Sequence, residues 1–320
     1  IDSKVVRNLI KNIISYFFPN YRKVFVLVLP MALQNLINVG VTSSDVIMLG
    51  RVGEKVLSGA SLGGQIYFIM TLIFFGLTSG ASVLTAQYWG KRDRDTIEKI
   101  LGMTLRLSVL VSLTFTIVTL CIPQYLMKIF TSDPEVVVQG AKYLRIVCFS
   151  YLPASLTMVY LNVMRSIERV AISTLVYFIS FLANIVLNAI FIFGLFGVPA
   201  MGVSGAALGT TIARLIELGI VIFYSTVYNK EVKVRLRYVI STEKWLFLDF
   251  MHFSLPVVIN EMLWGLGTST NAAILGHLGS AVTAANSVAQ VIRQLAMVIC
   301  FGLANATAIL IGKSIGEGKM

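Results

Sequence analysis

Three acidic residues lie within long apolar runs of the 320-residue sequence: Asp45, Glu217 and Glu261. A carboxylate in the hydrocarbon core of a bilayer is costly, so such residues usually face a water-filled cavity or a charged partner. A carboxylate that lines a cavity can exchange a proton or bind a cation. We therefore predict that Asp45 belongs to an ion-binding site. The alternatives are that it caps a helix end at the membrane interface or pairs with Arg51.

Polar residues recur near Asp45 at helical spacing. Gln34, Asn38 and Thr42 precede it at intervals of four, four and three positions, which places the four side chains on one helix face. A second polar stripe lies further along the chain and consists of Asn260, Trp264, Thr268 and Asn271. We expect the two stripes to form facing walls of a central substrate cavity.

Glu261 follows Pro256 by five positions. A proline inside a helix frees a backbone carbonyl and can kink the helix, and an acid near such a kink is a suitable site for a cation or a proton. The alternative for Glu261 is an ion pair with Arg293 on the next span. Glu217 lies three positions after Arg214, a spacing that favours an intrahelical ion pair and a structural role.

The sequence contains no pattern typical of metal binding or nucleophilic catalysis. Its three cysteines, Cys121, Cys148 and Cys300, form no CxxC pair, and its two histidines, His252 and His277, form no HExxH motif. We therefore predict no enzymatic activity, no metal site and no cofactor.

The composition indicates a polytopic α-helical membrane protein. The chain is 57% hydrophobic and only 13% charged, about half the charged fraction of a soluble domain. Apolar runs of about 20 residues or more are long enough to cross a bilayer. Eight such spans are expected, near residues 24–49, 57–87, 98–122, 138–163, 172–196, 203–227, 246–275 and 281–311.

Basic residues gather in alternate loops. Lys and Arg are abundant in 91–94, 165–169 and 230–244, whereas 197–202 and 276–282 contain none. The positive-inside rule then places the amino terminus in the cytoplasm of a protein of the cell membrane. The net charge of +11 is thus explained by topology, and we expect membrane lipids and no nucleic acid as partners.

We divide the chain into four segments. Residues 1–20 predict a basic amphipathic helix on the membrane surface, with a frayed tail as the alternative. Residues 21–228 form a first lobe of six helices, and 229–245 form a cytoplasmic linker between lobes. Residues 246–320 supply the first two helices of a second lobe.

An internal repeat supports this division. A shift of 226 positions places Pro30 on Pro256 and aligns residues 30–94 with the end of the chain without a gap, including Gly53 on Gly279. Six spans fit within one period, so both copies have the same orientation in the membrane. Because the second copy stops at Met320, we expect an intact protein of about twelve spans, of which this chain is a part.

The repeated segments resemble the multidrug and toxic compound extrusion (MATE) family. The resemblance rests on LPMALQNLINVGVTSSDVIMLGRVG (29–53), GLTSGASVLTAQYWGKRD (76–93), NIVLNAIFIFG (184–194), MGVSGAALGTTIAR (201–214) and LPVVINEMLWGLGTSTNAAILGHLG (255–279). It implies a V-shaped pair of six-helix lobes that works by alternating access as a monomer. It also implies export of small organic cations in exchange for H⁺ or Na⁺. Asp45 matches the first-helix acid of the family, and Glu261 resembles an acid of its seventh helix.

Asn184 and Asn188 lie one helical turn apart. In one branch of the family the second position is Asp, whereas Asn188 cannot titrate. Ion coupling is then expected to depend on Asp45, on Glu261, on helices beyond this chain, or on a Na⁺ site made of Asn oxygens and Glu261. Tyr67 and Met158 offer adaptable contacts to aromatic cations or serve as ordinary helix packing.

A second function within the same superfamily fold is the flipping of lipid-linked sugars. Such a substrate needs a strongly cationic cavity to hold pyrophosphate. Asp45 and Glu261 argue against this function, and Arg145 and Arg293 leave it open.

Overall fold

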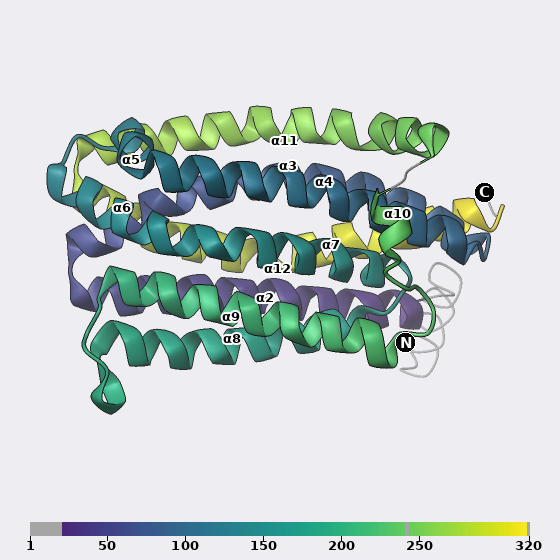
Figure 1. The fold of residues 1–320 in the computed structure, drawn as a ribbon, viewed down its shortest axis with the longest axis horizontal. Coiled ribbons are helices and arrows are strands. Elements are labelled where there is room, and N and C mark those ends of the chain that lie inside the picture. Colours follow the sequence, from purple (N-terminus) through teal and green to yellow (C-terminus); the bar gives the residue numbers. More distant parts are fainter. Residues whose placement is uncertain (1–20, 241–242, 319–320) are drawn as a thin grey trace, which may run out of the picture.

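The protein is a bundle of long helices that run nearly parallel to one another (Figure 1). The computed structural model describes residues 21–240 and 243–318, except for the side chains of 21–27 and 299. The predicted amphipathic segment 1–20 lies outside the described residues. The elements are α2 (Tyr21–Val52), α3 (Glu54–Gly90), α4 (Arg94–Cys121), α5 (Pro123–Phe130), α6 (Pro134–Val147), α7 (Tyr151–Ser166), α8 (Val170–Phe193), α9 (Val203–Phe223), α10 (Leu236–Ile240), α11 (Lys244–Leu278) and α12 (Ser280–Gly316).

Eight long helical segments occur in this part of the chain, each at the position of a predicted span. The 3₁₀ turn Cys148–Ser150 joins α6 to α7 in one span, and the π-helical turn Tyr224–Tyr228 extends α9. Six of the segments are long and apolar enough to cross a membrane over the described residues, and α12, taken as one bent span, makes a seventh. The remaining segment, α2, lies in the same bundle (Figure 1).

Polar residues at the ends of the spans account for the helix boundaries. Asp93 caps α4 by accepting a hydrogen bond of 3.1 Å from the Thr96 backbone N–H. Asp133 caps α6 in the same way and accepts a hydrogen bond of 2.9 Å from the Glu135 backbone N–H. Pro134 occupies the first position of this helix. The connections between spans lie alternately at the two ends of the bundle (Figure 1).

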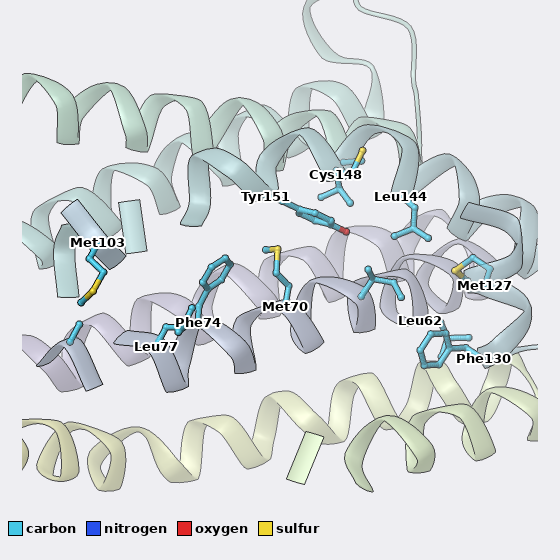
Figure 2. Close-up of a cluster of buried hydrophobic side chains, with 14 of the residues drawn as sticks. Leu62, Met70, Phe74, Leu77, Met103, Met127, Phe130, Leu144, Cys148 and Tyr151 are labelled. Carbon is cyan, nitrogen blue, oxygen red and sulfur yellow. The ribbon is translucent and has the colours of Figure 1, made fainter. Parts of the chain in front are cut away.

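The hydrophobic core lies between α3 and the span formed by α6 and α7. Figure 2 shows Met70 and Phe74 of α3 facing Cys148 and Tyr151. All four side chains are almost completely buried. Since apolar residues occur on all sides of α3, this helix is well suited to the centre of the bundle, where it also contacts α11 and α12.

The structure contains two copies of one helix pair. Both α3 and α12 have 37 residues, and each residue of α12 lies 226 positions after its counterpart in α3. The turns before them are glycines, Gly53 and Gly279, with φ of 158° and 125°, a backbone region that is essentially restricted to glycine. The two pairs α2–α3 and α11–α12 run in the same directions (Figure 1), as expected of a parallel repeat.

Reciprocal contacts relate the two copies by a pseudo-two-fold axis. Gly76 on α3 packs against the backbone of Val258 on α11, and its counterpart Gly302 packs against Ala32 on α2, the counterpart of Val258. Each contact is therefore made twice, as at an interface with two-fold symmetry. The arrangement is two parallel lobes, of which the second is represented by α11 and α12.

Candidate functional site

Asp45 is the acidic end of a chain of hydrogen bonds that links three helices. Asn188 Nδ2 of α8 donates to Asp45 Oδ1 over 2.6 Å and also to Asn184 Oδ1 over 3.2 Å. Asn184 Nδ2 in turn donates to Thr210 Oγ1 of α9 over 3.3 Å. Both asparagines are buried, whereas Asp45 is half-buried. The cluster therefore offers carboxylate and amide oxygens at a single point of the first lobe.

Asp45 opens onto a cavity of about 660 Å³ between the two lobes, here called the Asp45 chamber. Its walls come from α2, α3, α6, α9, α11 and α12, so both copies of the repeat contribute. The polar and aromatic lining residues are Thr42, Asp45, Ser61, Gln65, Phe68, Tyr143, Thr210, Trp264, Thr268, Thr283, Asn286, Ser287, Gln290, Arg293, Gln294 and Phe301. Aromatic rings beside a carboxylate suit an organic cation, which is attracted by both.

A second cavity, of about 450 Å³, lies nearer the end of the bundle that holds the basic loops. We call it the Arg165 chamber. It is lined from α2, α3, α7, α8, α9 and α12, and Thr42 belongs to the walls of both chambers. Its polar and aromatic lining residues are Gln34, Asn35, Asn38, Thr42, Tyr67, Phe75, Thr78, Ser79, Ser82, Asn162, Arg165, Tyr177, Arg214, Glu217 and Asn305.

An ion pair lies in the wall of the Arg165 chamber. Arg214 Nη1 is 2.7 Å from Glu217 Oε2, three residues later on α9. Ser180 Oγ donates to the same carboxylate oxygen over 2.9 Å. The predicted intrahelical pair of Glu217 is thus present, and its carboxylate has two partners.

The structure distributes the predicted cavity residues between the two chambers. Gln34, Asn38, Tyr67 and Met158 line the Arg165 chamber. Trp264 and Thr268 line the Asp45 chamber together with Asp45. Asn260 and Asn271 are exposed on α11 and line neither chamber.

Two of the ion pairs considered for the acids, Asp45 with Arg51 and Glu261 with Arg293, do not occur among the described residues. Asp45 bonds to Asn188 rather than to Arg51, which is exposed. Glu261 is half-buried and lines neither chamber, and no ion pair joins it to Arg293, which faces the Asp45 chamber.

Sequence reasoning missed Arg165 as a cavity residue. The sequence assigns Arg165 to a basic loop, because it lies near the end of a predicted span. In the structure it belongs to the last turn of α7 and lines a chamber. The signal was Asn162 one turn earlier, because a polar residue at that spacing extends the helix face on which Arg165 lies. Thr210 was also missed, since a threonine in a membrane helix is often bonded to its own backbone, as its neighbour Thr211 is to the Ala207 carbonyl.

Comparison with known proteins identifies the fold and the family. The sequence profile described as MatE matches residues 30–190. "Probable multidrug resistance protein NorM" of Agrobacterium fabrum is 24% identical over 99% of this chain and 68% of its own length. "Probable multidrug resistance protein YoeA" of Bacillus subtilis is 21% identical over 93% of this chain and 65% of its own length.

Solved structures with the same fold include a MOP superfamily transporter of Pyrococcus furiosus, with a TM-score of 0.81 and 22% sequence identity. The match covers 92% of this chain and 65% of the Pyrococcus chain. Another is a multidrug resistance MATE family transporter in an outward-facing conformation, with a TM-score of 0.80, 23% identity and the same coverage. This chain therefore spans about two thirds of the length of the proteins that it matches. Its profile match, its repeat and its bundle of apolar helices show that the chain belongs to the MatE family of multi-pass membrane transporters.

Proposed function

We propose that the full-length protein is a secondary antiporter that exports organic cations in exchange for a monovalent ion bound at Asp45. The observation that carries this proposal is the position of Asp45, which belongs both to the wall of the Asp45 chamber and to the buried hydrogen-bond chain. Two cations that need the same carboxylate compete for it. Competition of this kind is the basis of exchange, because each ligand stabilises the state in which the other is absent.

The buried cluster favours Na⁺ as the coupling ion. Asn188 Oδ1 is buried without a hydrogen-bond partner in the part of the chain that the structure describes, which is costly unless a cation or water satisfies it. Asp45, Asn184 and Asn188 together supply oxygen ligands, the type that hard cations take. A proton would use Asp45 alone and leave the asparagine oxygen unexplained.

The basic end of the bundle is proposed to face the cytoplasm, which puts the amino terminus inside the cell and the Asp45 chamber toward the outside. The protein is proposed to act as a monomer in the cell membrane. Glu261, which lies on α11 of the second lobe, is proposed as a second carboxylate for the ion or the cationic substrate. Its partners would come from the rest of the second lobe.

A flippase for lipid-linked sugars is not favoured. The relatives carry names of multidrug resistance proteins, and the carboxylate of Asp45 would repel a pyrophosphate in the larger chamber.

Competition binding tests the proposed antiport. Purified full-length protein is titrated with ethidium while Na⁺ replaces choline at constant ionic strength, and again over a series of pH values. We expect Na⁺ to raise the Kd of ethidium by about fivefold or more, and Asp45→Asn to abolish the dependence. Asp249→Asn, an exposed acid near the start of α11, should keep it. A pH effect without a Na⁺ effect would identify H⁺ as the ion, and independence from both would overturn the proposal.

A further inference from the structure

Arg165 is a cationic group in a cavity wall whose charge no neighbouring acid balances. It is half-buried, and no carboxylate within the described residues lies within ion-pair distance of it. The other arginine of the chamber, Arg214, is already paired with Glu217. The Arg165 chamber thus carries an excess of one positive charge among its described lining residues.

The guanidinium of Arg165 is held by neutral amides that use only part of its capacity. Its Nη1 donates to Gln34 Oε1 over 3.4 Å. With the Asn162 amide oriented to donate to the Thr78 carbonyl, Asn162 Oδ1 accepts from Arg165 Nη2 over 3.3 Å. Both bonds are long, and a guanidinium has five N–H donors. Most of its donor capacity therefore remains for a ligand in the chamber.

The supporting amide is itself fixed. Gln34 is almost completely buried, and its Nε2 donates to Thr174 Oγ1 over 2.8 Å. This bond orients the Gln34 oxygen toward Arg165, so α8 positions the guanidinium through α2. Such an arrangement holds a planar donor group in a defined direction without neutralising it, as recognition of a carboxylate requires.

The two chambers therefore differ in electrostatic character, because Asp45 shares the wall of its chamber with Arg293, whereas the Arg165 chamber has one positive charge in excess among its described lining residues. Gln34 precedes Asp45 by eleven residues of α2, a rise of about 16 Å. The carboxylate of the Asp45 chamber and the unpaired guanidinium of the Arg165 chamber lie at opposite ends of this helix segment, and Thr42 lies between them.

We infer that the Arg165 chamber is a subsite for the carboxylate of amphoteric organic substrates, with Arg165 as its specificity-determining residue. A substrate that arrives from the basic end of the bundle meets this chamber first and is held by its carboxylate. Its cationic group then competes with the ion at Asp45 after it has moved past Thr42. This inference rests on the proposed export of organic cations and specifies which of them gain an additional contact.

A pair of dyes that differ only in the carboxylate tests the inference. Rhodamine B is a zwitterion, and its ethyl ester is a permanent cation of nearly the same shape. Binding of each dye to purified full-length protein is measured by fluorescence anisotropy. Arg165→Gln should weaken rhodamine B binding by about 10-fold or more, the worth of a lost hydrogen bond to a charged group, and change ester binding by less than twofold. Arg145→Gln, an exposed arginine of α6 that lines neither chamber, should change neither.

Two further variants separate this role from a structural one. Arg165→Lys keeps the charge and should restore most of the affinity for rhodamine B. Asn162→Asp places a carboxylate beside an intact Arg165 and should abolish the preference for the zwitterion, even if Arg165→Gln does not fold. Equal loss of both dyes in Arg165→Gln, or an unchanged affinity for rhodamine B, would overturn the inference. Competition between the ester and the ion, measured on the same samples, tests the antiport separately.

Discussion

The hydroxyl groups of Ser61 and Ser287 lie 2.9 Å apart, although the residues are 226 positions apart in the sequence. Since 226 is also the period of the internal repeat, each serine is the counterpart of the other. Equivalent residues can touch each other only near the symmetry axis that relates the two copies. Glu54 and Ser280, another pair of counterparts, are also hydrogen-bonded at this end of α3 and α12.

This axial contact must open and close if the lobes rock against each other. In a protein whose native cysteines are replaced, the pair Ser61→Cys and Ser287→Cys is expected to form a disulfide under mild oxidation. The cross-link should stop ethidium efflux, and reduction should restore it. Each single cysteine variant serves as the control. A cross-link that forms fully and leaves efflux unchanged would show that this contact is static.

The reciprocal contacts of Gly76 and Gly302 predict a steric penalty. A Cβ atom at Gly76 would lie 2.6 Å from the Val258 Cα, and one at Gly302 would lie 3.2 Å from the Ala32 Cα. Gly76→Ala should therefore lower the free energy of unfolding by about 1–3 kcal/mol, as overpacking does, and Gly302→Ala by less. Gly267→Ala, where the Cβ meets no atom within 4 Å, is the control. Thermal denaturation in detergent would measure all three, and equal melting temperatures would contradict the packing.

An ion pair joins the lobes at the basic end. Lys313 Nζ of α12 lies 2.7 Å from Glu168 Oε2, in the turn between α7 and α8. Lys313→Gln should favour opening at this end. Because the pair is partly exposed, we expect the labelling rate of a cysteine inside the chamber to rise by up to about fivefold. The measurement is the labelling rate of Ser79→Cys, in the wall of the Arg165 chamber, by a membrane-impermeant maleimide. The charge swap Glu168→Lys with Lys313→Glu should restore slow labelling, and an unchanged rate in Lys313→Gln would exclude a latch.

One loop contact predicts a dependence of stability on pH. The hydrogen bond from Arg169, together with its charge, holds the pKa of Glu231 below its usual value of 4.5. A carboxyl whose pKa is lower in the folded state stabilises the fold above its unfolded-state pKa, and this stabilisation is lost as the pH falls through the folded-state pKa. Glu231→Gln should therefore lower the melting temperature slightly at pH 7, and this effect should shrink progressively as the pH falls below 4.5. Because Arg169 is largely exposed, we expect the contact to contribute roughly 0–1 kcal/mol to the free energy of unfolding. An effect that grows toward low pH would contradict the assignment.

The spans could be predicted from the sequence to within a few residues. Residues 57–87 were expected for the helix Glu54–Gly90, and 98–122 for Arg94–Cys121. The differences arise because hydropathy detects only the part of a helix in the bilayer, whereas caps such as Asp93 extend it into water. The repeat was also visible, since glycines and prolines at span ends keep a fixed register.

The grouping of polar residues could be predicted less well. Helical spacing shows that Asn260 and Trp264 share a face of α11, but only packing between lobes decides which of them reaches a chamber. Arg165 could not be assigned to a cavity because its charge is equally compatible with a basic loop. Its orientation depends on Gln34, 131 residues away, and contacts at such separations are not encoded in local pattern.

The proposed coupling of cation export to an ion at Asp45 can be measured by transport with full-length protein in proteoliposomes. Ethidium efflux is followed under an imposed Na⁺ gradient and, separately, an imposed proton gradient, for wild type, Asp45→Asn, Glu261→Gln and the control Asp249→Asn. The structure predicts that the Na⁺ gradient drives efflux in wild type and in the control, and that Asp45→Asn abolishes this gradient-driven efflux. Efflux in Asp45→Asn that still responds to the gradient would contradict the claim.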